Sequence, residues 1–186
     1  SAQKFREYYR DDINLIVDFF SSKLFREKFG TSAKAKVVTS FAMFYDLENP
    51  VQFANEVREI LHEKGVWVLE MSYLPSMLKQ NSYDTICHEH LEYYGLKQLD
   101  FIIRKAKLKI LDYSLNSVNG GSISISVCHD DLEKEDNSKQ IKKLIEEEEK
   151  SINTFSFTNF EKEIKESRTQ LLQRLTELKK KNKKIY

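Results

Sequence analysis

The chain has 186 residues, 40% of them hydrophobic and 12% aromatic, which suits one globular domain with or without an appendage and argues against global disorder. A formal net charge of +1 predicts neither a nucleic acid nor an anionic membrane as partner. No apolar run approaches the roughly 18 residues of a membrane-spanning helix, no signal peptide opens the chain, and two cysteines without a disulfide framework indicate a reducing compartment, by default the cytoplasm.

Predicted strands and helices alternate along the first half of the chain. Apolar runs predict buried strands, which are residues 13–20, 36–41 and 66–71. Ser21 or Ser22 is placed to cap a helix that ends at Gly30. Pro50 suits the first turn of a second helix, which Gly65 closes. This alternation predicts an α/β fold with a parallel sheet.

The predicted sheet continues into a closing pair of strands. Residues 72–95 have no clear period and are predicted as a long functional loop with a helical turn near Met77, and residues 96–107 as an amphipathic helix. The strands at 109–115 and 122–127 are separated by the VNGG turn of residues 118–121, which is too short for a parallel crossover. The sheet is therefore expected to end in an antiparallel hairpin.

The composition shifts toward lysine and glutamate near Asp130. We therefore divide the chain into an α/β domain over residues 1–130 and a helical extension over residues 131–186. The glutamates of residues 146–149 are predicted as a solvated helix face. The last helix carries an apolar stripe, for which we favour a helix resting on the domain. The alternative is a helical hairpin or a dimer arm.

The densest group of proton-transfer side chains lies in residues 83–94, YDTICHEHLEYY. Imidazole titrates near neutral pH and suits a general base, which makes His88 and His90 candidates. An extended backbone would put both histidines on one side and Glu89 on the other. The alternatives are a metal pair, for which no third ligand is evident nearby, and histidines that only satisfy buried backbone groups.

Four stretches of the chain carry a resemblance to a known family, and the third of them followed by the last is the specific signal. They are FYDLENP, GVWVLEMSYLPSML, NSYDTICHEHLEYY and NGGS, at residues 44–50, 65–78, 81–94 and 119–122. With them the chain resembles the sugar C-methyltransferases that act on nucleotide-linked keto-sugars with S-adenosylmethionine. The resemblance covers about residues 1–130 well and the C-terminal helix more loosely. It implies an α/β fold, namely a partial Rossmann-like methyltransferase sheet that ends in an antiparallel hairpin and is followed by C-terminal helices.

The same resemblance predicts missing parts. Family members begin with a cysteine-rich zinc module, continue with a methyltransferase domain whose cofactor loop is rich in glycine, and end with a second Rossmann-like domain. The chain has only two cysteines, and none of its five glycines forms such a loop. We therefore expect a central fragment that is inactive alone.

The resemblance also implies roles within the histidine cluster. His90 is implied as the base that removes a proton next to the ketone, with Glu89 as a second polar group and His88 beside them. Cys87 stands where relatives carry a tyrosine, so the role of that tyrosine is not transferred. The residues expected to contact the sugar are Tyr83, Tyr94 and Asn119. No metal is expected.

Aromatic side chains follow the strand at 36–41, at its carboxyl end, where open parallel sheets bind ligands. Because aromatic faces attract a sulfonium cation, we expect Phe41, Phe44 and Tyr45 to wall the S-adenosylmethionine site. The alternative is that each of them packs the sheet against a helix.

The predicted function is an S-adenosylmethionine-dependent C-methyltransferase that methylates carbon next to a ketone, through an enolate, on a nucleotide-linked deoxysugar. The alternative is a non-catalytic scaffold or partner-binding remnant of such an enzyme. We expect a homodimer through the C-terminal helix or through the exposed edge of the strand at 36–41. The edge is expected to be covered either by the N-terminal segment or by a neighbouring copy.

Overall fold

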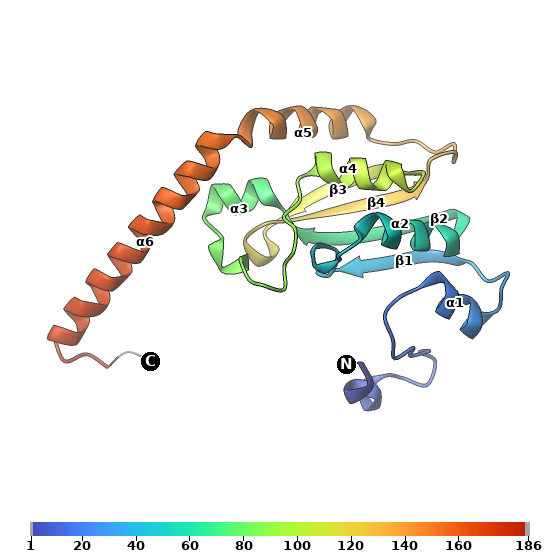
Figure 1. Cartoon of the computed structure of the whole chain (residues 1–186), viewed down its shortest axis with the longest axis horizontal. Coiled ribbons are helices and arrows are strands. Elements are labelled where there is room, and N and C mark those ends of the chain that lie inside the picture. Colours follow the sequence, from blue (N-terminus) through green and yellow to red (C-terminus); the bar gives the residue numbers. More distant parts are fainter. Residues whose placement is uncertain (1, 185–186) are drawn as a thin grey trace.

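A computed structural model of the chain describes residues 2–184 and contains a four-stranded mixed sheet (Figure 1). The strands are β1 (Ala35–Phe41), β2 (Leu61–Ser72), β3 (Leu108–Asn116) and β4 (Ser122–His129). Their order across the sheet is β1-β2-β4-β3, with β1 parallel to β2 and β4 antiparallel to both of its neighbours. The α/β fold with a sheet that ends in an antiparallel hairpin is thereby confirmed.

Helices precede, connect and follow the strands. The α-helices are α1 (Ser22–Phe29), α2 (Pro50–Ile60), α3 (Leu74–Gln80), α4 (Leu96–Lys105), α5 (Ser138–Ser151) and α6 (Thr154–Lys180). Short 3-10 helices are η1 (Ala2–Tyr8), η2 (Phe44–Asp46), η3 (Tyr83–Thr85) and η4 (Val118–Gly120). The predicted caps of α1 are confirmed, because Ser21 accepts from the Leu24 N–H and Gly30 ends the helix with φ 98°.

The core lies between the sheet and helices α2 and α4, which cover one face of it (Figure 1). Every second residue of β2 points into this layer, and Trp67 and Leu69 are fully buried there. The Trp67 indole N–H donates to Ser40 Oγ of β1 at 3.0 Å, so the buried donor is satisfied. Burying each such side chain contributes about 1.5–3 kcal/mol.

The strand predicted at residues 13–20 is wrong. This segment runs as irregular chain between η1 and α1, and Phe19 is 92% exposed. Its end packs on a helix and not on the sheet, because the Phe20 ring lies 5.0 Å from the ring of Phe53 in α2. An apolar run becomes a strand only where a neighbouring strand offers backbone partners, and Asn14 and Asp18 also interrupt this one.

The outer edge of β1 is likewise not covered by the N-terminal segment, contrary to that branch of the expectation. Among the described residues β1 pairs with β2 alone. Val37 and Phe41 of β1 are 64% and 58% exposed. The sheet therefore presents an edge with free hydrogen-bonding groups and exposed apolar side chains.

Gly65 does not end α2 as predicted. That helix ends at Ile60, and Gly65 lies inside β2, next to a register shift in the pairing of β1 with β2. A Cβ atom on Gly65 would lie 2.9 Å from the His62 carbonyl oxygen and 3.0 Å from that of Ala35. The glycine thus permits a close approach of backbones rather than a helix end.

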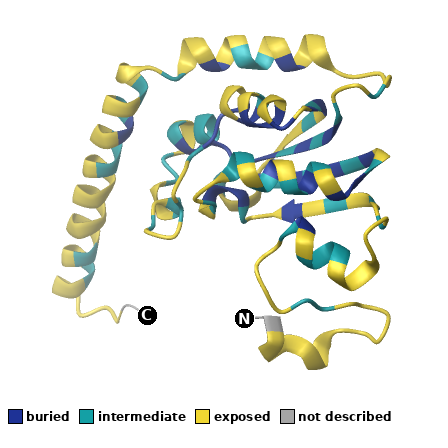
Figure 2. Ribbon diagram, turned by 45° about the vertical axis from the view of Figure 1, so that its right-hand side comes forward, coloured by how far each residue is buried: buried dark blue, intermediate teal, exposed yellow. Residues whose placement is uncertain are grey.

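The C-terminal helices lie outside the sheet, and Figure 2 shows α6 as largely exposed. Ile141 of α5 joins the core beside α4 and β3, while Phe160 is the buried residue of α6. Leu171 and Leu172, farther along α6, remain half exposed. Within residues 2–184, no helix combines the length and the apolar character that crossing a membrane requires. The predicted boundary near residue 130 stays a prediction.

Candidate active site

The histidine cluster lies on the segment between α3 and α4, at the end of the sheet where β1 and β2 terminate (Figure 1). Helix α3 ends at Asn81, whose left-handed backbone (φ 53°) turns the chain into η3. The segment then runs irregularly to Gly95, which caps α4. Carboxyl ends of parallel strands are where open α/β sheets bind ligands, so the cluster occupies the expected edge.

His90 is held in one orientation by two neighbours. Its Nδ1 lies 2.8 Å from the Thr85 carbonyl oxygen. A carbonyl only accepts, so Nδ1 carries a hydrogen, and in the neutral imidazole Nε2 then has the lone pair. The imidazole also lies against the ring of Tyr45, with 4.2 Å between the centroids. The half-buried His90 is therefore oriented as a general base requires.

The extended arrangement expected around Glu89 is wrong. The His90 N–H donates to the Cys87 carbonyl oxygen at 3.3 Å, which closes a turn with His88 and Glu89 at its corners. Both corner side chains are exposed, whereas His90 is half-buried. Only His90 of the two histidines is thus packed against a second element of the fold. Among residues 2–184, no three His, Cys, Asp or Glu side chains come together as a metal site.

The three aromatic candidates for the cofactor lie in different surroundings. Phe41 ends β1 and is exposed, whereas Phe44 has no exposed surface and packs on Trp67 with 5.8 Å between the ring centroids. Tyr45 is 8% exposed, and its ring faces His90. The structure does not bring the three together as one wall. Their contact with S-adenosylmethionine stays a prediction.

The three candidates for the sugar are also spread out. Tyr83 on η3 is 43% exposed and Tyr94 is 5% exposed. Asn119 is exposed on the hairpin turn and has φ 49°. Ser82 Oγ donates to the carbonyl oxygen of the next residue of that turn, Gly120, at 3.4 Å. The hairpin turn therefore lies beside the start of the histidine segment. The sugar contacts themselves stay predictions.

One structural residue of this region was mispredicted as solvated. Glu148 of α5 is 3% exposed, and its carboxylate accepts from the Leu96 and Lys97 N–H groups at 2.6 and 3.0 Å. It also accepts from the Tyr73 hydroxyl at 2.6 Å. Burial first, and then the hydrogen bond to Glu148, raise the pKa of Tyr73 above its usual range. A run of glutamates does not predict this burial, because the two N–H groups and the hydroxyl that Glu148 binds are far away in the chain.

Helix α6 braces the other end of the histidine segment. Glu163 accepts hydrogen bonds from Asn81, at the end of α3, and from Asn159 at 2.8 Å. Both bonds hold the pKa of the Glu163 carboxyl below its usual value. The C-terminal extension is therefore attached to the segment that carries the candidate site.

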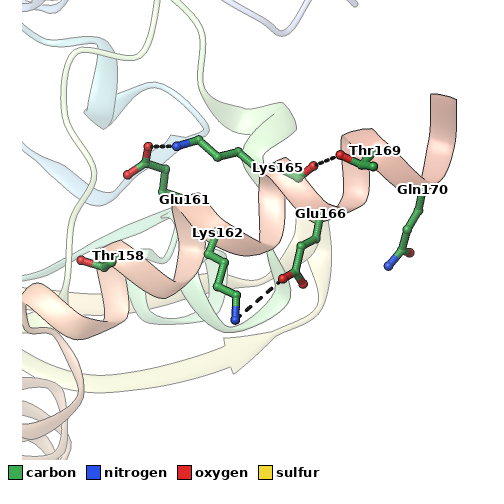
Figure 3. Close-up of a pocket in the computed structure, with 7 residues that line it drawn as sticks. All are labelled: Thr158, Glu161, Lys162, Lys165, Glu166, Thr169 and Gln170. Atoms are coloured by element: carbon green, nitrogen blue, oxygen red, sulfur yellow. Dashed lines mark hydrogen bonds and ion pairs between the residues drawn. The ribbon is translucent and has the colours of Figure 1, made fainter. Parts of the chain in front are cut away.

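A hollow farther along α6 is of a different kind (Figure 3). Its lining residues all belong to this one helix, and they are Thr158, Glu161, Lys162, Lys165, Glu166, Thr169 and Gln170. Lys162 and Glu166 pair with each other at 3.7 Å, and Lys165 pairs with Glu161. Pairs of this spacing are typical of a solvated helix face. The hollow contains none of the candidate site residues.

The sequence of the chain is similar to those of known proteins over part of its length. Residues 117–186 match the family model described as the C-methyltransferase C-terminal domain. The chain is also 32% identical over 91 residues to the C-methyltransferase NovU of Streptomyces niveus. Over these stretches the chain is similar to C-methyltransferases. The matched stretch is 49% of this chain but only 22% of that relative, so the chain spans a minor part of its length.

One solved structure shares the fold. A chain from the complex between the Haloferax volcanii Trm112 methyltransferase activator and its methyltransferase has a TM-score of 0.50 at 13% identity. The likeness covers 69% of this chain and 67% of that one. The LepI complex with SAM is a looser likeness, with a TM-score of 0.44 and 10% identity over 52% of this chain and 27% of that one. The first of these likenesses shows the fold alone.

The buried hydroxyl of Tyr94 leads to a testable expectation. It has no hydrogen-bond partner among the described residues, and burial followed by the nearby Glu92 raises its pKa to about 12. Replacing Tyr94 by phenylalanine removes an unpaired buried group, so at pH 7 the free energy of unfolding should rise by about 1 kcal/mol. Urea unfolding of both proteins measures the difference.

The same pair of proteins should diverge further at alkaline pH. The folded-state pKa of Tyr94 is raised above the unfolded value of 10.0, so ionisation of Tyr94 does not affect the free energy of unfolding below that pH. As pH rises from there toward about 12, the free energy of unfolding of the wild type falls, because the unfolded chain releases the Tyr94 proton first. Between pH 9 and pH 11 the advantage of Tyr94→Phe should grow by about 1 kcal/mol. A difference that stays constant with pH would contradict this assignment.

Proposed function

We propose that this chain carries the acceptor-binding and proton-abstracting part of an S-adenosylmethionine-dependent C-methyltransferase. The proposed acceptor is a nucleotide-linked deoxysugar with a ketone. The observation that carries the proposal is His90, whose Nδ1 is anchored on the Thr85 carbonyl so that Nε2 is free to act as a base. The relationship to C-methyltransferases supports the reaction class.

The proposed chemistry begins with a C–H bond next to the ketone. His90 Nε2 takes the proton, and the electron pair of that bond moves into the enolate. S-adenosylmethionine supplies an electrophilic methyl group, to which the enolate carbon forms the new C–C bond while the S–CH₃ bond breaks and its electrons stay on sulfur. The imidazolium then passes its proton to water. Exposed Glu89 and His88 are proposed to contact the sugar from the corners of the turn.

Each described glycine has a structural role elsewhere in the fold, so none is left to form a loop that binds S-adenosylmethionine. Gly30 ends α1, Gly65 lies at the irregularity in β2, and Gly95 caps α4. Gly120 and Gly121 form the hairpin turn, with φ 78° and 117°. We therefore infer that the glycine-rich loop for S-adenosylmethionine comes from outside these 186 residues. Of the aromatic candidates, exposed Phe41 at the open edge of the sheet is the one proposed to meet the cofactor.

The enolate can be tested without a methyl donor. The full-length protein is incubated in deuterium oxide with a nucleotide-linked keto-deoxysugar, and deuterium next to the ketone is followed by proton NMR. We expect exchange well above the rate without protein, because reversible proton removal does not require the methyl transfer. Methylation on addition of S-adenosylmethionine without prior or accompanying exchange at that carbon would exclude the proposed enolate.

We also propose a homodimer formed through the open edge of β1 or through the exposed part of α6. The exposed Val37 supports the edge, and the exposed Leu171 and Leu172 support the helix. Light scattering should give twice the monomer mass. Val37→Lys should restore the monomer if β1 is the interface, and the double change Leu171→Gln and Leu172→Gln if α6 is. A wild-type protein that is monomeric at high concentration would exclude both.

The cysteines support a reducing, cytoplasmic setting for this reaction. Cys87 and Cys128 are free thiols in the structure, and Cys128 is buried. Burial is the main cause that raises the pKa of the Cys128 thiol, which keeps it protonated and inert.

A further inference from the structure

We propose that Tyr45 is a positioning residue that holds His90 in its proton-accepting orientation. This inference rests on the proposed function only in assigning His90 to proton transfer. The ring of Tyr45 lies against the imidazole, at 4.2 Å between centroids and 50° between planes. The Tyr45 carbonyl oxygen also accepts from the N–H groups of Leu91 and Glu92, at 3.0 and 3.1 Å. One residue thus contacts both the side chain and the backbone that follows it.

The second contact of His90 completes the orientation. The Thr85 carbonyl accepts from Nδ1 on one side of the imidazole, while the Tyr45 ring covers a face of it. Thr85 is itself held, because its Oγ1 donates to the Ser82 carbonyl oxygen at 2.8 Å. The Tyr93 hydroxyl also donates to the Thr85 carbonyl oxygen, at 3.4 Å. An aromatic face and a single acceptor together select one rotamer and one tautomer of the imidazole.

The position of Tyr45 is set by the sheet. It follows Phe44, which is fully buried against Trp67 of β2. The turn that carries both begins at Ala42, whose N–H donates to the Glu70 carbonyl oxygen of β2 at 2.9 Å and whose φ is 50°. A left-handed alanine persists only where its surroundings hold it. The ends of β1 and β2 therefore fix the position of Tyr45, and Tyr45 in turn contacts His90.

The Tyr45 ring also suits the charged state that the reaction creates. An aromatic face within about 6 Å of a cation stabilises it, and this one remains in place when His90 becomes imidazolium. The phenol itself stays neutral, because burial first and then the neighbouring Asp46 and Cys87 raise the pKa of Tyr45. The contact between the two residues is one of rings, at 4.2 Å between centroids, so the ring is the part of Tyr45 that positions His90.

The test compares Tyr45→Leu with Tyr45→Phe in the full-length protein. With histidine labelled by ¹⁵N, the shifts of Nδ1 and Nε2 report which nitrogen carries the hydrogen, and exposed His88 serves as the internal control. Wild type and Tyr45→Phe should show His90 mainly as the Nδ1–H tautomer. Tyr45→Leu should show averaged shifts for His90 and unchanged shifts for His88.

Turnover should follow the spectra. We expect kcat to fall by about 10–100-fold in Tyr45→Leu, with KM little changed, and to stay within about threefold in Tyr45→Phe, because small misplacements of a reacting group are costly. If Tyr45→Leu does not fold, Tyr45→Met replaces it, with a thermal melt as the check. A folded variant with the wild-type His90 tautomer overturns the proposal. A tautomer that depends on Tyr45 in a protein without methyltransferase activity would uphold the proposal and defeat the proposed function.

Discussion

Replacing His90 by glutamine in the full-length protein is expected to lower kcat for methylation by about 10²–10⁴-fold. Glutamine keeps a polar, uncharged side chain of similar length, but its amide cannot accept a proton at neutral pH. The loss therefore reports the removal of the basic imidazole, which in the wild type lies on the Thr85 carbonyl through Nδ1. Deuterium exchange next to the ketone should fall in parallel, since it reports the same step.

Two further histidine variants show whether the effect is specific. His62→Gln lies on β2, where His62 Nδ1 accepts from the Lys64 N–H, and it should leave turnover unchanged. His88→Gln should cost less than His90→Gln, because His88 is exposed at a corner of the turn. Turnover that survives in His90→Gln would remove His90 from the role of base. A larger loss in His88→Gln would transfer that role to His88.

Replacing Glu148 by alanine is expected to lower the free energy of unfolding by about 3–5 kcal/mol. The change removes the acceptor for two N–H groups at the start of α4 and for the buried hydroxyl of Tyr73. The first N–H groups of a helix have no partner within the helix, and a carboxylate there also meets the positive end of the helix dipole. Hydrogen bonds to a buried charge are the strong ones, so their loss is large.

The neighbouring Glu149 is the matched control. Its carboxylate pairs with Lys97 at the surface, where the two side chains are 51% and 55% exposed. Exposed pairs contribute little, so Glu149→Ala should change the free energy of unfolding by less than about 1 kcal/mol. Urea unfolding at neutral pH compares the two variants. Equal losses from both would show that Glu148 is not the buried acceptor of α4.

The elements that the sequence predicted correctly are those with signals close together in the chain. Ser21 and Gly30 bracket α1, and a glycine-rich turn of four residues leaves no choice but an antiparallel hairpin. The strand predicted at residues 13–20 was wrong because a strand depends on a neighbour elsewhere in the chain, and among the described residues β1 pairs only with β2. The prediction that Gly65 ends a helix was wrong for a related reason, because a glycine is required there by the close approach of the Ala35 backbone.

In the candidate site, too, the sequence indicates the types of side chain but not the contacts that they make. The side-chain types of residues 83–94 predict proton transfer, and that chemistry stays a prediction. The turn at Cys87 to His90 could not be predicted, since the competing extended form has the same side chains. Phe44 and Tyr45 are neighbours of similar type, yet one enters the core and the other meets the histidine. Only the path of the chain after β1 decides which of the two does so.

The sequence by itself determined the caps of α1, the closing hairpin and the residue types of the histidine cluster, because these depend on neighbours within a few positions. The tertiary structure alone decided that His90 is the oriented histidine, that Tyr45 and the Thr85 carbonyl orient it, and that Glu148 is buried. Those contacts join backbone carbonyls and ring faces from separate elements. A carbonyl is the same group at every residue, so its place in a site leaves no mark in the sequence.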